Sequence, residues 1–108
     1  MLTLFGLKTC DTCRKARRAA ENAGVSLTFV DVRDTPLTPE QRSRFLDAFG
    51  DALINRKSTT WRTLSEAERQ LPADALLEAH PTLMKRPVID GATLTLGWTK
   101  DVEATHLG

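Results

Sequence analysis

The sequence has few cysteines, few histidines and almost no net charge, and each shortage excludes a class of protein. Its 15 Lys and Arg residues nearly balance its 14 Asp and Glu residues, so the net charge is +1. No overall field therefore favours nucleic acid or a membrane surface as a partner. Only His80 and His106 could join the two cysteines around a zinc ion, and neither has the spacing of a zinc finger. We expect no bound metal.

The chain also lacks a long apolar run, an internal repeat and a low-complexity tract. No apolar segment approaches the roughly 20 residues that span a membrane, and no basic leader precedes an apolar core at the N-terminus. A chain of 108 residues with 41% hydrophobic residues can form one small core. The sequence therefore predicts a single domain over residues 1–108, located in the cytoplasm.

The two cysteines that are present, Cys10 and Cys13, form the most informative motif. They follow the apolar run Leu2–Phe5 and open a segment with the pattern of a helix. A strand that ends at a Cys-x-x-Cys opening a helix is the redox-site arrangement of thioredoxin-like proteins. The helix N-terminus favours the thiolate of Cys10, and Cys13, one turn later, can attack a mixed disulfide and release the partner.

Two other interpretations of this pair remain. A structural disulfide across so short a loop would add little stability, and a reducing cytosol disfavours it. Inert buried thiols are the stronger alternative, because free cysteine is often buried in protein cores.

The remaining pattern predicts an α/β order. We expect strands over residues 2–6 and 27–32 with a helix over 11–23 between them. This helix has one face of small residues. Pro87–Leu96 predicts two short strands joined at Asp90-Gly91, and Thr99 can cap a last helix over 100–106. The order β-α-β and β-β-α is that of a thioredoxin-like fold.

A helical insertion separates these two halves. Thr38 to Gln41 has a capping residue, a proline at the first position and a capping-box glutamine, so a helix should begin there and bury Phe45, Leu46 and Phe49. A short helix is expected over 51–55, another capping box at Ser65–Glu68, and a further helix over 73–80 that ends before Pro81.

With these residues in view, the chain resembles the ArsC/Spx superfamily of arsenate-reductase-like proteins, and within it the YffB-type branch. Three segments in the right order carry the resemblance, which covers nearly the whole chain. They are Leu4–Arg17 around the cysteines, Asn55–Arg62, and His80–Val88.

The resemblance implies roles for individual residues. A cysteine at the position of Cys10 is the nucleophile of arsenate reductases, whose adduct is resolved by glutathione and glutaredoxin. Arg56 and Arg86 match arginines that hold the oxyanion, and Pro87 matches a proline that is typically cis and faces the active cysteine. Planar guanidinium groups suit oxyanions and carboxylates alike, so these arginines also fit glutathione.

Other cations could act beside the thiol, and simpler roles exist for the arginines. Lys8, Arg14 and Arg86 are candidates for stabilising the thiolate, and Arg14 is also a candidate anion-binding residue. The alternative for Arg56 and Arg86 is a solvated surface residue or a structural ion pair.

One position departs from the arsenate reductase pattern. A third arginine lies after the final hairpin in those enzymes, where this chain has Leu96-Gly97-Trp98.

The YffB branch is inferred to contain glutathione-dependent thiol reductases, and in Spx regulators a Cys-x-x-Cys at the position of Cys10 and Cys13 is a redox switch on a protein that binds RNA polymerase. The sequence thus predicts a cytosolic thiol–disulfide oxidoreductase that uses glutathione as co-substrate and has no tightly bound cofactor. Glutaredoxin is a candidate partner. The alternatives are an Spx-like regulator that binds the polymerase α-subunit, and a true arsenate reductase.

Overall fold

The computed structural model describes residues 1–108, which divide into two compact units. The first unit comprises Met1–Asp34 and Arg86–Gly108, and the second comprises Thr35–Lys85. None of the helices combines the length and the apolar content needed to cross a membrane.

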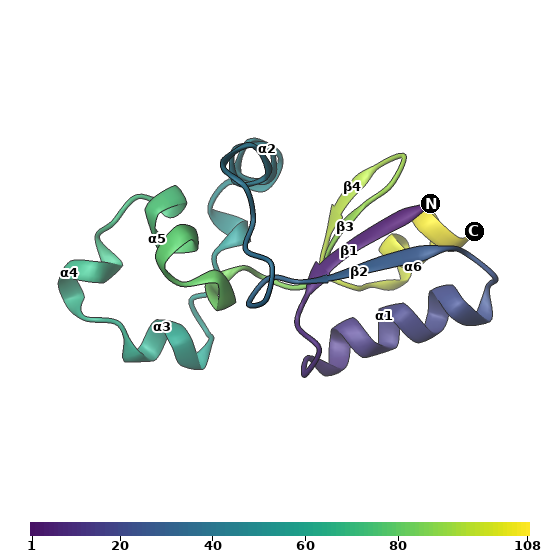
Figure 1. Cartoon of the computed structure of the whole chain (residues 1–108), viewed down its shortest axis with the longest axis horizontal. Coiled ribbons are helices and arrows are strands. Elements are labelled where there is room, and N and C mark those ends of the chain that lie inside the picture. Colours follow the sequence, from purple (N-terminus) through teal and green to yellow (C-terminus); the bar gives the residue numbers. More distant parts are fainter. The chain divides into compact units, whose positions relative to one another are not determined.

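The first unit contains a four-stranded sheet with the order β2-β1-β3-β4 (Figure 1). The strands are β1 (Leu2–Gly6), β2 (Leu27–Asp31), β3 (Val88–Asp90) and β4 (Leu94–Leu96). Strand β1 runs parallel to β2 and antiparallel to β3, and β3 and β4 form an antiparallel hairpin. Since a parallel pair requires a crossover, helix α1 (Asp11–Asn22) connects β1 to β2.

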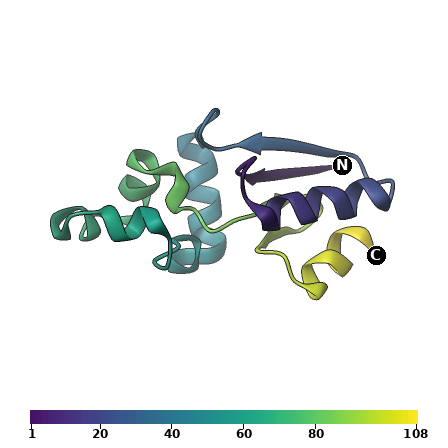
Figure 2. The ribbon, with the colours of Figure 1, turned by 90° about the horizontal axis from the view of Figure 1, so that it is seen from below.

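One face of this sheet is covered by two helices. Leu4 pairs with Phe29 on one side and with Ile89 on the other, so the three side chains share a face. They pack with Cys13 and Ala16 of α1. Helix α6 (Lys100–Leu107), which lies beside α1 in Figure 2, adds Val102 and Leu107 to the same cluster. The thioredoxin-like fold expected from the sequence is confirmed, with residues 35–85 as a helical insertion between its halves.

The insertion consists of six short helices, half of which begin at a residue whose side chain caps the helix. They are α2 (Pro39–Phe49), the 3-10 helix η1 (Gly50–Leu53), α3 (Thr59–Thr63), α4 (Glu66–Arg69), α5 (Ala73–Ala79) and the 3-10 helix η2 (Pro81–Leu83). Both expected capping boxes form, with Gln41 N–H donating to Thr38 Oγ1 and Glu68 N–H donating to Ser65 Oγ at 3.1 Å each. Helix α3 and η2 were not expected from the sequence.

The buried face of α2 differs from the expectation. Phe45 is fully buried, but Leu46 and Phe49 are only half-buried, and Arg42 is buried instead. Arg42 Nε donates to Asp74 Oδ1 at 2.8 Å, Nη2 to Glu78 Oε2 at 3.2 Å and Nη1 to the Leu37 carbonyl oxygen at 3.2 Å. An arginine can be buried here because Asp74 and Glu78 of α5 accept hydrogen bonds from its guanidinium. The periodicity of apolar residues does not reveal such partners.

Candidate active site around Cys10 and Cys13

Cys10 and Cys13 lie at the start of α1, directly after the loop that follows β1. Cys10 is the N-cap residue and has extended backbone angles, while Cys13 is inside the first turn and completely buried. Both are free thiols, and Cys10 is partly exposed. A hydrogen bond from Cys10 N–H to the Leu7 carbonyl at 3.1 Å closes the loop, and a bond from Arg14 N–H to the Cys10 carbonyl at 3.0 Å begins the helix.

The pKa values of the two thiols are shifted in opposite directions. Partial burial tends to raise the pKa of Cys10, but hydrogen bonds from the backbone N–H and thiol of Cys13, together with the hydrogen bond and charge of Arg86, outweigh burial and lower it. Burial is the main cause that raises the pKa of Cys13 to about 12; the hydrogen bond and charge of Cys10 act in the same direction, and the backbone hydrogen bond with Leu7 and the charge of Arg86 act against it. The thiolate, which is the nucleophilic form, therefore concentrates on Cys10.

Arg86 is the cation that the structure brings to the thiol. It lies two residues before β3, and the Arg86–Pro87 peptide bond is cis, as expected from the resemblance. The other two candidate cations are directed elsewhere. Lys8 Nζ pairs with Asp34 Oδ2 at 2.9 Å, and Arg14 Nε donates to the Lys8 carbonyl at 3.0 Å while its Nη1 lies 3.5 Å from Asp11 Oδ1.

Arg56 belongs to the second unit, where it lies beside an aromatic ring. Its guanidinium is stacked over Trp61, with 5.3 Å between Cζ and the ring centroid, and it lies 3.9 Å from Asp51 Oδ1. Arg69 faces the same ring at 5.6 Å and donates to the Trp61 carbonyl. About half of the Arg56 side chain remains exposed, so it is available to an anion from solvent.

Two residues of the first unit support the thiol loop and were not identified from the sequence. Asp31, at the end of β2, accepts hydrogen bonds from the backbone N–H groups of Lys8 and Arg33, both at 2.9 Å. Gly6 ends β1, and a Cβ at this position would overlap the sulfur of Cys13. The sequence did offer a signal for each residue: Asp31 is a charged residue at the end of an apolar strand, and Gly6 is a glycine shortly before the cysteine motif.

The segment around Gly97, where arsenate reductases have a third arginine, lies beside the cis proline. Gly97 follows β4 with a φ of 83°, a conformation that favours glycine, and its N–H donates to the Pro87 carbonyl at 2.8 Å. This segment therefore presents a backbone turn and no guanidinium. No cluster of three or more His, Cys, Asp or Glu side chains that could hold a metal ion occurs in residues 1–108.

The surroundings of Cys10 and Cys13 are those of a thiol-based oxidoreductase fold of the arsenate-reductase-like class. They combine a thiol of lowered pKa at a helix start with a buried second thiol and with an arginine before a cis proline, on a thioredoxin-like sheet. The chain belongs to the ArsC family, whose family model matches residues 5–104.

Solved structures and curated relatives agree with this assignment. The YFFB (PA3664) protein is 32% identical, with a TM-score of 0.89 over 100% of both chains. An arsenate reductase (ArsC) related protein from Brucella melitensis is 36% identical, with a TM-score of 0.73 over 95% of this chain and 92% of the other. The global transcriptional regulator Spx 1 of Bacillus cereus is 28% identical over 94% of this chain and 82% of its own length.

Proposed function

We propose that the protein is a cytosolic, glutathione-dependent thiol–disulfide oxidoreductase in which Cys10 is the nucleophile. The observation that carries this proposal is the contrast between the two thiols, with a lowered pKa at partly exposed Cys10 and a pKa of about 12 at buried Cys13. Disulfide exchange through a dithiol site uses one thiol that readily forms the thiolate and a second thiol close enough to attack the mixed disulfide.

The first step is attack of the Cys10 thiolate on the sulfur of a mixed disulfide between glutathione and a substrate thiol. A bond forms between Cys10 and the glutathione sulfur, and the substrate leaves as a thiolate that takes up a proton from solvent. The proposed role of Arg86 is to hold Cys10 as the thiolate before attack and to bind a carboxylate of glutathione afterwards. Pro87 is proposed to shape the groove in which the disulfide lies, with Arg14 and Arg56 as further anion-binding residues.

Resolution follows by one of two routes that have the same overall balance. In the first, Cys13 loses its proton to solvent and attacks Cys10, which releases glutathione as a thiolate and leaves a Cys10–Cys13 disulfide that two further glutathione molecules reduce. In the second, external glutathione attacks the Cys10–glutathione disulfide directly. Formation of the Cys10 disulfide removes the neighbouring negative charge that raises the pKa of Cys13, which eases its deprotonation.

The test is turnover of a mixed disulfide of glutathione and 2-mercaptoethanol, with reduced glutathione as reductant and oxidised glutathione as the measured product. Wild-type protein should give steady turnover, and Cys10→Ser should abolish it. Cys13→Ser separates the routes, since activity that persists in this variant indicates resolution by external glutathione. Absence of turnover by wild-type protein with both thiols reduced would refute the proposal.

A regulator that binds RNA polymerase is the second candidate, and the likeness to Spx 1 over 94% of the chain favours it. This candidate predicts tight association with the isolated polymerase α-subunit that changes when Cys10 and Cys13 are oxidised. Mixing the protein with purified α-subunit and measuring a dissociation constant in both redox states distinguishes it from the enzyme.

A further inference from the structure

One face of α1 carries three positive charges, two of which form no ion pair within the first unit. We call the exposed side chains of Arg14, Lys15 and Arg18 the α1 basic face. Arg14 is engaged by the Lys8 carbonyl and Asp11, but Lys15 and Arg18 form no ion pair. Since like charges three or four positions apart destabilise a helix by about 0.2–0.5 kcal/mol per pair, helix stability does not explain this arrangement.

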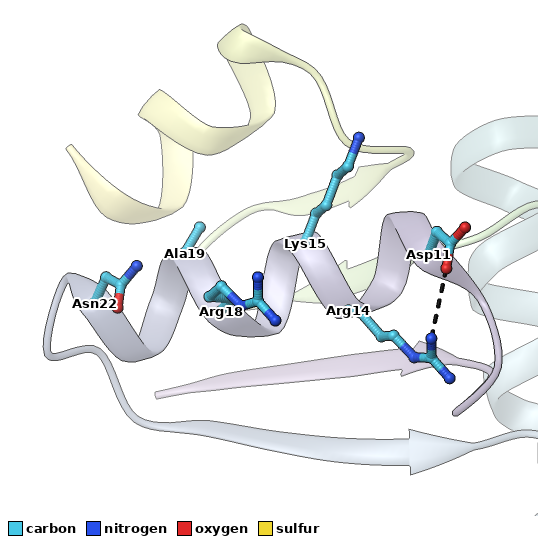
Figure 3. Close-up of a pocket in the computed structure, with 6 residues that line it drawn as sticks. All are labelled: Asp11, Arg14, Lys15, Arg18, Ala19 and Asn22. Carbon is cyan, nitrogen blue, oxygen red and sulfur yellow. Dashed lines mark ion pairs between the residues drawn. The ribbon is translucent and has the colours of Figure 1, made fainter.

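The neighbouring arginine shows the contrast. Arg17 is stacked over Phe29 of β2, with 4.5 Å between its Cζ and the ring centroid. Its charge and its methylene groups thus cover the sheet, which is a structural role. Lys15 and Arg18 have no such contact and stand out from the helix (Figure 3).

The α1 basic face also lines a hollow rather than a flat surface. A depression of about 510 Å³ runs along α1 and contains Asp11, Ala19 and Asn22 in addition to the basic face (Figure 3). Through Ala19 and Asn22 it continues into a second depression of about 490 Å³ between α1 and α6. The small side chain of Ala19 leaves room for a chain to lie along the helix.

The distance from the reactive thiol determines what can use this surface. Arg18 is eight residues after Cys10, so it lies about 12 Å farther along the helix. A glutathionyl group joined to Cys10 is a tripeptide of roughly 10 Å from end to end, with its sulfur near the middle. Its carboxylates therefore do not reach the far part of the α1 basic face, whereas a longer polypeptide does.

We propose that the α1 basic face docks an acidic segment of a protein substrate whose cysteine, in a disulfide or in a mixed disulfide with glutathione, is reduced at Cys10. This proposal rests on the proposed function and adds its substrate class. An extended segment covers about 12 Å with roughly four residues, so the recognised Asp and Glu residues lie two to five positions from the target cysteine. Their carboxylates suit the guanidinium of Arg18 and the ammonium of Lys15.

The test compares two glutathionylated peptides that differ only in charge. In one, four Glu residues flank the cysteine on each side, and in the other they are replaced by Gln. At low salt, kcat/KM should be about tenfold higher for the acidic peptide, and the preference should fade at 0.3 M salt because exposed charges are screened. Lys15→Glu with Arg18→Glu should remove the preference and change turnover of the neutral peptide less than twofold.

Arg17→Glu is the matched control, because it places the same charge change one residue from Arg18, at a side chain that is stacked over Phe29 and does not line the depression of the α1 basic face. It should retain most of the preference for the acidic peptide. Equal kcat/KM for the two peptides, or an equal loss in Arg17→Glu and Arg18→Glu, would overturn the docking proposal while leaving the oxidoreductase intact.

A binding measurement separates failure of docking from failure of the enzyme. The same two sequences, with the target cysteine replaced by serine and a fluorescent label attached, are titrated with Cys10→Ser protein. Tighter binding of the acidic peptide that depends on Lys15 and Arg18 supports docking even if turnover is absent. Stronger binding of a single-stranded oligonucleotide of equal charge would contradict the assignment to an acidic protein segment.

Discussion

The backbone N–H of Lys8 donates a hydrogen bond of 2.9 Å to Oδ2 of Asp31. This bond joins the loop that leads to Cys10 to the end of the neighbouring parallel strand. The carboxylate is buried and also accepts from the backbone N–H of Arg33. Asp31 thus holds the loop that leads to Cys10 from a position far away in the sequence.

Asp31→Asn should lower the free energy of unfolding at pH 7 by roughly 2 kcal/mol. Burial tends to raise the pKa of Asp31, but the two N–H donors and Arg33 lower it to about 2 from its ordinary 3.8. A lowered pKa contributes stability that is complete above about pH 4 and is lost as the pH falls toward 2. Urea unfolding between pH 2 and pH 7 measures it.

The control for this prediction is Asp34→Asn. Asp34 pairs with Lys8 Nζ at 2.9 Å, but both side chains are more than 60% exposed. Its removal should cost less than about 0.5 kcal/mol. Equal destabilisation by the two variants would contradict a special role for Asp31.

Cys10 should be alkylated before Cys13 by iodoacetamide at mildly acidic pH, because the lowered pKa of Cys10 gives it the larger thiolate fraction. Mass spectrometry of the labelled peptides identifies the site. Preferential labelling of Cys13 would reverse the assigned roles of the two thiols.

Arg86→Ala should move the pH profile of Cys10 alkylation to higher pH, because the variant loses a hydrogen bond and a positive charge that lower the pKa of Cys10. Arg14→Ala is the matched control and should leave the profile in place, since the Arg14 guanidinium binds the Lys8 carbonyl and Asp11 instead. A profile that is unchanged in Arg86→Ala would indicate a structural arginine.

Arg42→Ala should lower the free energy of unfolding by about 1–3 kcal/mol, because it removes three hydrogen bonds of a buried guanidinium. Arg42→Met separates the charge from the packing of the methylene groups, and it should recover only part of the loss. If Arg42→Met is as stable as wild type in urea, the ion pairs with Asp74 and Glu78 contribute nothing measurable.

Arsenate should be reduced at a rate near background when glutathione and glutaredoxin are supplied. Near Gly97 the chain presents a backbone turn where arsenate reductases have a third arginine, so fewer donors can orient the oxyanion for attack by Cys10. Measurement of arsenite formation, with Cys10→Ser as the blank, checks this. Efficient reduction that depends on Cys10 would make arsenate reductase the preferred function.

Local chemistry allowed much of the fold to be predicted from the sequence. The capping boxes at Thr38 and Ser65 and the cap at Thr99 each act within four residues, so they mark helix starts without reference to the rest of the chain. The alternation of apolar runs with helical patterns then fixed the order of elements, and the position of Cys10 at a helix start predicted the more acidic thiol.

Tertiary structure decided the features that depend on residues far apart in the chain. It placed Arg86, rather than Lys8 or Arg14, beside the thiol. Charge alone does not distinguish these three cations in a sequence, and only the family resemblance pointed to Arg86. Tertiary structure also buried Arg42 against α5 and brought Asp31 to the loop of Cys10. Such pairings require chain segments to meet across a sheet or between helices, and periodicity and local propensity carry no information about which charged groups will meet.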